Sequence, residues 1–152
     1  MIELKNQISI NRSREEVFRF IADFENIPLW NYYVKEVRLI SSPDGNRKRY
    51  HQTRLHDEQI FDIEEFVFPD KLTIQTTGNS KLKFRRNFLF SDVNKDVCRI
   101  DDSFDIEIRA PQLVQQIFKT KMSRAVKMNL EKLKELLEIG TVRLQNGKIS
   151  VR

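Results

Sequence analysis

The prediction of the fold starts from residues 111–140, which read PQLVQQIFKTKMSRAVKMNLEKLKELLEIG. Apolar residues recur along it at the spacing of one helical face. They are Val114, Phe118, Met122, Ala125, Val126, Leu130, Leu133 and Leu137. Pro111 suits the first turn of a helix, and Gly140 is a natural stop just after its end. The pattern therefore predicts one helix of about 29 residues, roughly 43 Å long, which is enough to cross a whole β-sheet.

The chain before this helix opens with one strand and a short helical region. Residues 2–10 alternate between apolar and polar side chains, apart from Asn6, and this alternation predicts a strand. Ser13 and Glu16 form a capping-box signature, which predicts a helix that begins near Arg14. The proline at position 28 should stop or turn this segment, so that three apolar residues close one end of the core. These three are Ile27, Leu29 and Trp30.

Between Val34 and Arg109 the apolar spacing changes to the two-residue period of strands. The pattern predicts further strands at about residues 34–42, 47–56, 59–68, 71–77, 82–92 and 96–109. The segments between them are short and rich in residues that favour turns. Neighbouring strands should therefore pair antiparallel, as a meander.

Three stretches carry a resemblance to a known family. They are INRSREEVFRFIAD at residues 10–23, NIPLW at 26–30 followed by VKEV at 34–37, and NLEKLKELLE at 129–138. In this order and spacing they resemble the START/Bet v 1-like (SRPBCC) superfamily, and in particular its polyketide cyclase/dehydrase-like members. The resemblance spans about residues 2–139. It implies an α+β helix-grip fold, in which a seven-stranded antiparallel sheet curls around a long C-terminal helix, with two short helices after the first strand.

The resemblance also implies a cavity between the sheet and the long helix. Proteins of this superfamily bind lipids, sterols, plant hormones or aromatic polyketides, and a minority catalyse cyclisation or dehydration. They share no catalytic motif, so the resemblance implies a fold and a cavity but no active-site residues.

Length and composition agree with one domain. A chain of 152 residues suffices for one core, and the low Gly and Pro content excludes collagen-like and low-complexity classes. We expect a helix-grip domain at residues 1–140 and a C-terminal extension at 141–152. No apolar run is long enough to cross a membrane, and the first residues lack the apolar core of a signal peptide. Cys98 is the sole cysteine, so we expect a cytoplasmic protein without disulfides.

The net charge of +5 is concentrated in the C-terminal part of the chain. Residues 111–152 carry nine Lys and Arg against three Glu, whereas residues 1–110 carry 18 basic and 19 acidic residues. A basic segment of this kind could attract nucleic acid or an anionic membrane. No nucleic-acid motif accompanies it, so we interpret it as the solvated face of the long helix and expect no nucleic-acid partner.

The sequence contains no recognisable cofactor or metal motif. Its four glycines form neither a dinucleotide-binding fingerprint nor a phosphate-binding loop. His51 and His56 lie five positions apart on one predicted strand, so they point to opposite faces and cannot bind one metal ion together. We therefore expect no metal site and no cofactor. Cys98 lies on an apolar strand face and is expected to be a small core residue.

Each of the last two predicted strands carries one charged residue within an apolar stripe. The stripes are Leu82, Phe84, Arg86, Phe88 and Phe90 on one strand, and Cys98, Ile100, Asp102, Phe104 and Ile106 on the next. A hairpin that turns at Asn94 places Arg86 directly opposite Asp102, and Phe88 opposite Ile100. Because charges are almost never buried unpaired, we predict an ion pair. Arg86 could in addition hold a ligand carbonyl, carboxylate or phenolate. A purely structural ion pair, or an arginine that reaches past the sheet to solvent, stays open.

We expect the cavity to be lined by residues of these two strands, the short helices and the long helix. The candidates are Arg86, Asp102, Phe84, Phe88, Phe104, Trp30, Phe118 and Met122. The sequence does not decide which face of residues 47–56 and 59–68 points inward. Glu64 and Glu65 could supply a general base in a cyclase, although strand carboxylates are more often simply solvated. No residue is assigned a catalytic role.

The last twelve residues contain a hairpin signal. Asn146-Gly147 lies between two alternating segments and favours a two-residue turn. Such a turn pairs Leu144 with Ile149 and Val142 with Val151, and places all four apolar residues on one face. We predict a hairpin whose apolar face docks on this domain or on a second copy of the chain. The alternative is a frayed tail, because a lone hairpin is marginal in water.

The resemblance implies the binding or transport of a small hydrophobic ligand, either a lipid or an aromatic or polyketide-like molecule, in the cavity under the long helix. Two alternatives stay open. One is a cyclase or dehydratase that acts on an aromatic or polyketide-like substrate. The other is a protein- or membrane-surface interaction module that uses the basic C-terminal helix. We expect a monomer or a homodimer.

Overall fold

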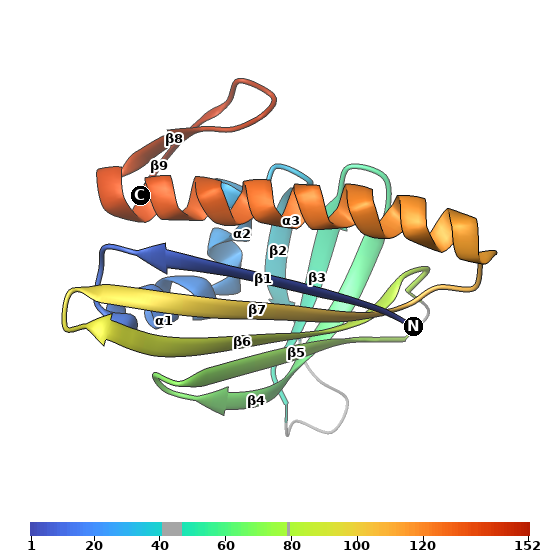
Figure 1. Ribbon diagram of the computed structural model, residues 1–152, viewed down its shortest axis with the longest axis horizontal. Coiled ribbons are helices and arrows are strands. Elements are labelled where there is room, and N and C mark those ends of the chain that lie inside the picture. The colour runs from blue at the N-terminus through green and yellow to red at the C-terminus, as the bar shows by residue number, and fades with distance from the viewer. Residues whose placement is uncertain (41–46, 79) are drawn as a thin grey trace.

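Figure 1 shows the computed structural model, which describes residues 1–40, 47–78 and 80–152. Its elements in chain order are β1 (Ile2–Ile10), α1 (Arg14–Ala22), a 3-10 turn (Phe24–Asn26), α2 (Ile27–Trp30), β2 (Val34–Ile40), β3 (Arg49–Arg54), β4 (Glu58–Val67), β5 (Lys71–Thr77), β6 (Lys83–Asn94), β7 (Val97–Glu107), α3 (Gln112–Ile139), β8 (Thr141–Arg143) and β9 (Ile149–Val151). The predicted strands and the long helix are present, with ends that differ by a few residues. Residues 41 and 42, which the alternation also assigns to a strand, lie outside the described residues.

The main sheet has seven antiparallel strands in the order β1-β7-β6-β5-β4-β3-β2. The meander from β2 to β7 pairs each strand with its neighbour in sequence, and β1 closes the sheet by pairing with β7. Figure 1 shows α3 running across the sheet, with β2 and β3 standing upright behind it while β1, β7 and β6 lie below it. The helix packs against β1 and α2. This architecture confirms the predicted helix-grip fold.

The capping signals of the two longer helices can be compared with the structure at each helix end. Pro111 is the N-cap of α3, and Gly140 ends the helix in the left-handed region at φ 95°, where its N–H donates to the Leu136 carbonyl at 2.9 Å. At α1, the Glu16 backbone N–H donates to Ser13 Oγ at 3.2 Å, as the capping-box signature predicts. The helical segment after β1 ends at Ala22, well before Pro28. The expectation that Pro28 stops this segment is therefore wrong, because this proline lies in the first turn of α2, where its missing N–H has no cost.

The register of the β6–β7 hairpin differs from the prediction by two residues. Arg86 lies opposite Phe104 and Phe88 lies opposite Asp102, because the hairpin turns at Lys95 and Asp96, beyond the predicted position, and a bulge between Asp92 and Asn94 takes up one residue of the resulting shift. A shift of two preserves the face of every side chain, since the strand period is two. The predicted apolar stripes therefore still face the core, but Arg86 and Asp102 are diagonal neighbours instead of direct partners.

The C-terminal hairpin forms, but in a register that is shifted by one residue. Val142 lies opposite Ser150 and the Leu144 N–H donates to the Lys148 carbonyl at 2.8 Å, so the loop has three residues, with Gly147 at φ 84°. A one-residue shift moves every side chain of one strand to the other face. Val142 and Leu144 are buried as predicted, whereas Ile149 and Val151 are 56% and 65% exposed. The prediction that all four share one buried face is wrong.

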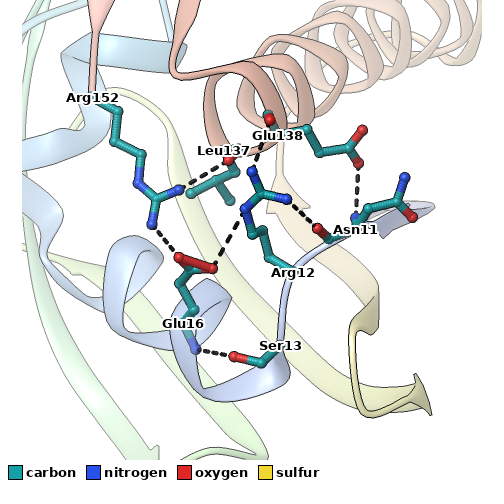
Figure 2. A network of polar contacts seen from close by, with 7 residues as sticks. All are labelled: Asn11, Arg12, Ser13, Glu16, Leu137, Glu138 and Arg152. Atoms are coloured by element: carbon teal, nitrogen blue, oxygen red, sulfur yellow. Dashed lines mark hydrogen bonds and ion pairs between the residues drawn. The ribbon is translucent and has the colours of Figure 1, made fainter.

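Polar contacts fasten the end of α3 to the start of α1 (Figure 2). Arg152 donates to the Leu137 carbonyl at 2.9 Å and to the Glu16 carboxylate at 2.6 Å. Arg12 donates to the Glu138 carbonyl at 2.8 Å, and the Asn11 N–H donates to the Glu138 carboxylate at 2.8 Å. The last carbonyls of a helix have no partner within the helix, so these arginines satisfy groups that would otherwise need water. We call this set of contacts the C-terminal clamp.

Candidate functional site

A cavity of about 720 Å³ lies between the curved sheet and α3. Its walls come from α2 and the start of β2, from strands β3 to β7, and from α3. The lining residues are Ile27, Asn31, Tyr33, Val34, Gln52, Arg54, His56, Gln59, Phe61, Ile74, Leu82, Phe84, Arg86, Phe104, Phe118, Lys121, Met122, Ala125, Val126 and Asn129. The helix segment that starts at Phe118 thus forms one wall, and the strands form the other.

Apolar side chains make up most of the cavity wall. Phe84 on β6 and Phe104 on β7 meet edge to face, with ring centroids 5.3 Å apart. They contribute to the wall because both strands turn alternate residues toward the concave side of the sheet. Phe118 and Met122 lie one helical turn apart on α3 and contribute to the helix wall. A surface of this kind suits the apolar body of a small molecule.

Arg86 and Asp102 form the ion pair that the charged residues within the apolar stripes predict. Arg86 Nε donates to Asp102 Oδ1 at 2.9 Å, and Nη2 donates to Oδ2 at 2.6 Å. The Asp102 side chain is 0% exposed, and the guanidinium lies over the rings of Phe88 and Phe104 at 4.5 and 4.2 Å. The two-point geometry and the flanking rings fix the orientation of Arg86.

Five of the eight predicted cavity residues line the cavity: Arg86, Phe84, Phe104, Phe118 and Met122. Asp102, Phe88 and Trp30 do not, although all three are buried. Asp102 is covered by Arg86, and the Phe88 ring packs against the same guanidinium. Trp30 ends α2 within the core. Alternation along a strand identifies which residues face inward, but it does not say how far along the strand the core is filled.

Apart from Arg86, the sequence did not lead us to the polar residues of the wall. Gln52 on β3 lies opposite Gln59 on β4, and its Nε2 donates to Gln59 Oε1 at 3.0 Å. Asn129 on α3 is also buried and lines the cavity. Gln52 and Arg54 show which face of β3 points inward, a question that the alternation leaves open. The sequence does contain a sign that Asn129 is special, because this residue interrupts an apolar face of α3 that is otherwise continuous from Val126 to Leu137.

The two candidate general bases are placed elsewhere. Glu64 accepts from Arg85 at 3.1 Å, and Glu65 lies 2.9 Å from Lys71. Neither residue lines the cavity. Cys98 is a core residue as predicted, and burial raises the pKa of its thiol to about 11, so it is protonated at neutral pH. Within residues 1–40, 47–78 and 80–152, no three His, Cys, Asp or Glu side chains are grouped in a way that could hold a metal ion.

A second hollow, of about 830 Å³, lies beside the N-terminus. It is lined by Met1, Lys81, Leu82, Lys83, Glu107, Ile108 and Arg109. Four of these seven residues are charged, and Leu82 lines both hollows. We interpret this hollow as a polar approach next to the apolar cavity, because its wall lacks the aromatic character of the cavity. None of the helices in the described part of the chain is long and apolar enough to span a membrane.

Fold and cavity together define a helix-grip protein of the START-like class. The family model described as "Polyketide cyclase / dehydrase and lipid transport" matches residues 1–138, and the chain belongs to this family. A comparison with curated proteins found no match.

Solved structures share the fold at low sequence identity. A protein from Thermus thermophilus is 16% identical, with a TM-score of 0.71, and the match covers 88% of this chain and 95% of that one. A START superfamily protein from Mycobacterium smegmatis is 15% identical, with a TM-score of 0.67 over 89% and 98% of the two chains. The di-domain ARO/CYC StfQ from the steffimycin biosynthetic pathway is 10% identical, with a TM-score of 0.71 over 89% of this chain and 45% of that one. At these identities the likeness shows the fold.

Proposed function

We propose that this protein binds a small, mainly hydrophobic molecule in the cavity under α3. The observation that carries the proposal is the cavity itself, about 720 Å³ with aromatic walls. Ligand pockets for small molecules fall in the range of roughly 300–1,000 Å³ and combine apolar walls with a few polar groups. The family description, which includes lipid transport, agrees with this use of the cavity.

Filling the cavity tests this proposal. Ala125 lines the cavity on α3, so Ala125→Trp should occupy part of the ligand volume. Met128 lies on the exposed side of the same helix, so Met128→Trp adds the same ring without entering the cavity. We expect the wild type and Met128→Trp to bind the uncharged dye N-phenyl-1-naphthylamine at one site, and Ala125→Trp to bind it about tenfold or more weakly. Native mass spectrometry of the purified wild type should in addition show a co-purified small molecule. Equal dye binding by folded Ala125→Trp would contradict the proposal.

A second candidate function is contact with an anionic surface through the first half of α3. Leu113 and Ile117 are 74% and 51% exposed, although they are large and apolar. The same half carries basic side chains and no Asp or Glu between Gln112 and Met128. Exposed apolar residues together with Lys and Arg favour the surface of an anionic bilayer. Vesicles of phosphatidylglycerol should then sediment with the protein, vesicles of phosphatidylcholine should not, and Ile117→Glu should abolish the difference.

The cyclase or dehydratase alternative requires proton donors and acceptors at the cavity. The wall contains Tyr33 and His56, and the described residues that line it include no carboxylate. Turnover of hydroxylated aromatic substrates that is lost in His56→Ala, without loss of dye binding, would support an enzyme. No turnover by a protein that binds these molecules tightly would support a carrier.

A further inference from the structure

The C-terminal hairpin has two faces, and only one of them packs on the domain. Val142 and Leu144 are buried in the core cluster. Ile149 and Val151 lie on the opposite face, and both are more than half exposed. In Figure 1 the hairpin projects from the end of α3, away from the main sheet. The family model matches residues 1–138, so the exposed apolar face belongs to a segment that the fold of the family does not explain.

The backbone of Ile149 points toward the outer edge of β9. The Leu144 N–H donates to the Lys148 carbonyl at 2.8 Å, so these two residues form a hydrogen-bonded pair. In an antiparallel ladder such pairs alternate with pairs whose N–H and C=O groups point away from each other. Arg143 and Ile149 form the next pair, and the Arg143 carbonyl indeed points outward, where it accepts from Lys132 on α3 at 2.7 Å. The N–H and C=O of Ile149 therefore point to the opposite edge.

Val151 repeats this arrangement at the other end of the hairpin. The Arg152 N–H donates to the Gly140 carbonyl at 2.9 Å, so the neighbouring pair, Thr141 with Val151, also points its backbone groups outward. The small sheet contains β8 and β9 alone, and within the described part of the chain no protein group bonds the outer N–H and C=O groups of Ile149 and Val151. A row of free groups at a strand edge is a template for another strand.

The sequence of β9 is complementary to itself at this edge. Two copies of β9 related by a two-fold axis at Ser150 run antiparallel, and Ile149 then lies opposite Val151 of the second copy. Both residues point their backbone groups to the shared edge, so each such pair is a hydrogen-bonded pair. The apolar side chains of both copies meet on one face of the joined sheet, with Thr141 and Arg143 on either side. An apolar centre with a polar rim is typical of protein interfaces.

We propose that the outer edge of β9 is a homodimer interface, in which the hairpins of two copies form one continuous antiparallel sheet. Lys148 lies opposite Arg152 of the second copy in this register, but the Arg152 charge is already matched by Glu16 at 2.6 Å. The contact is small for a protein interface, so the dimer should be reversible, with a dissociation constant of about 10–100 μM. The proposal does not depend on the cavity or on its ligand.

Sedimentation velocity of the full chain, from about 5 to 500 μM, tests the proposal. We expect a monomer–dimer equilibrium in the wild type. Ile149→Lys and Val151→Lys place a charge at the shared edge, and each should weaken dimerisation at least about tenfold. Leu113→Lys changes a similarly exposed apolar residue in the first half of α3 and should leave dimerisation unchanged. Because all three side chains are exposed, the melting temperatures of the dilute variants should change little.

Disulfide trapping tests the register. In the proposed pairing the Cα of Ile149 lies about 5.5 Å from that of Val151 of the second copy, which suits a disulfide. Two copies of the same residue lie about 8–9 Å apart, which is too far. An equal mixture of Ile149→Cys and Val151→Cys should therefore form disulfide-linked dimers under mild oxidation, and either variant alone should form far fewer. Cys98, the sole cysteine of the wild type, is buried and does not compete.

Each outcome of these experiments decides the proposal. A concentration-dependent dimer that both lysine changes in β9 weaken, with cross-links mainly in the cysteine mixture, supports it. A chain that stays monomeric over the whole range overturns it. A dimer that Leu113→Lys abolishes, and that the changes in β9 leave intact, overturns it in favour of a contact through α3. Cross-links that form as readily in one cysteine variant alone as in the mixture overturn the register and with it the proposed interface.

Discussion

The two halves of α3 both carry apolar residues, but those of the C-terminal half are buried in the core and those of the N-terminal half are exposed or line the cavity. From Val126 onward, its apolar face is buried against the core, and Leu133 is fully covered. In the first half, Leu113 and Ile117 lie exposed, and Phe118 and Met122 line the cavity. In Figure 1 the hairpin and the short helices lie near the C-terminal end of α3, whereas its N-terminal end lies on the opposite side of the view.

The C-terminal half is held by contacts that the N-terminal half lacks among the described residues. The C-terminal clamp joins its last turn to the segment between β1 and α1, to α1 and to the final residue of the chain (Figure 2). The hairpin adds Val142 and Leu144 to the same core cluster. Burial of this kind stabilises a helix far more than its intrinsic propensity does. The difference teaches that one helix can serve as an anchor at one end and as the wall of a cavity at the other.

The largest expected effect comes from charging the anchored half. Leu133→Asp would bury an unpaired carboxylate, at a cost of several kcal/mol against a total stability of about 5–15 kcal/mol. We expect this variant to unfold, or nearly so, in circular dichroism and thermal melts. The matched change in the other half, Leu113→Asp, should shift the stability by less than about 0.5 kcal/mol, because this side chain is exposed. Similar melting temperatures for both variants would contradict the proposed division of the helix.

The buried ion pair should give the next largest effect. Asp102→Ala leaves the Arg86 guanidinium buried without its partner and should reduce the free energy of unfolding by about 3–5 kcal/mol. The double change Arg86→Leu/Asp102→Leu should recover much of this loss, since neither charge remains. Urea denaturation of the single and double variants measures the coupling. Small, additive effects of the two single changes would contradict a strong pair.

The C-terminal hairpin should give a somewhat smaller effect and tests its register. Leu144 is buried, so Leu144→Ala should cost about 2–4 kcal/mol. Ile149 is exposed in the observed register, so Ile149→Ala should cost less than about 0.5 kcal/mol. The two-residue turn that the Asn146-Gly147 signal predicts would bury both residues and make the two costs similar. Thermal melts of the two variants therefore distinguish the registers.

The sequence predicted those features that depend on periodicity and on local capping. The alternation located every strand of the main sheet, and Pro111 and Gly140 bounded the long helix. The face of Arg86 was predicted correctly even though its pairing register was wrong, because a two-residue shift keeps the face. The registers were predicted less well, because periodicity does not show which residues form a turn, where a strand bulges or how many residues a hairpin loop contains.

The candidate site was only partly predictable for a related reason. Periodicity separates inward from outward side chains, and it identified Phe84, Arg86 and Phe104 in the wall. It does not distinguish a residue that faces a cavity from one that faces packed neighbours, so Trp30 and Phe88 were assigned to the wall but lie in the core. Polar residues at inward positions, such as Gln52 and Asn129, were not predicted to line the cavity, because the sequence alone does not show that these side chains are buried.

The smallest expected effect concerns acid pH and the C-terminal clamp. Burial opposes ionisation of Glu138, but hydrogen bonds from Lys134 and the Asn11 N–H, with the charges of Lys134 and Arg12 nearby, lower its pKa below the ordinary 4.5. A pKa that is lower in the folded state stabilises the fold above the unfolded-state value, and this stabilisation is lost as the pH falls through the folded-state value. Glu138→Gln should therefore cost about 0.5–1 kcal/mol at pH 7, after allowance for solvent screening, and almost nothing once the pH lies below the folded-state pKa. Glu135→Gln, an exposed change on the same helix outside the C-terminal clamp, is the matched control. Urea denaturation of the three proteins at several pH values measures this difference, and a cost for Glu138→Gln that is constant with pH would show that the clamp acts without the Glu138 charge.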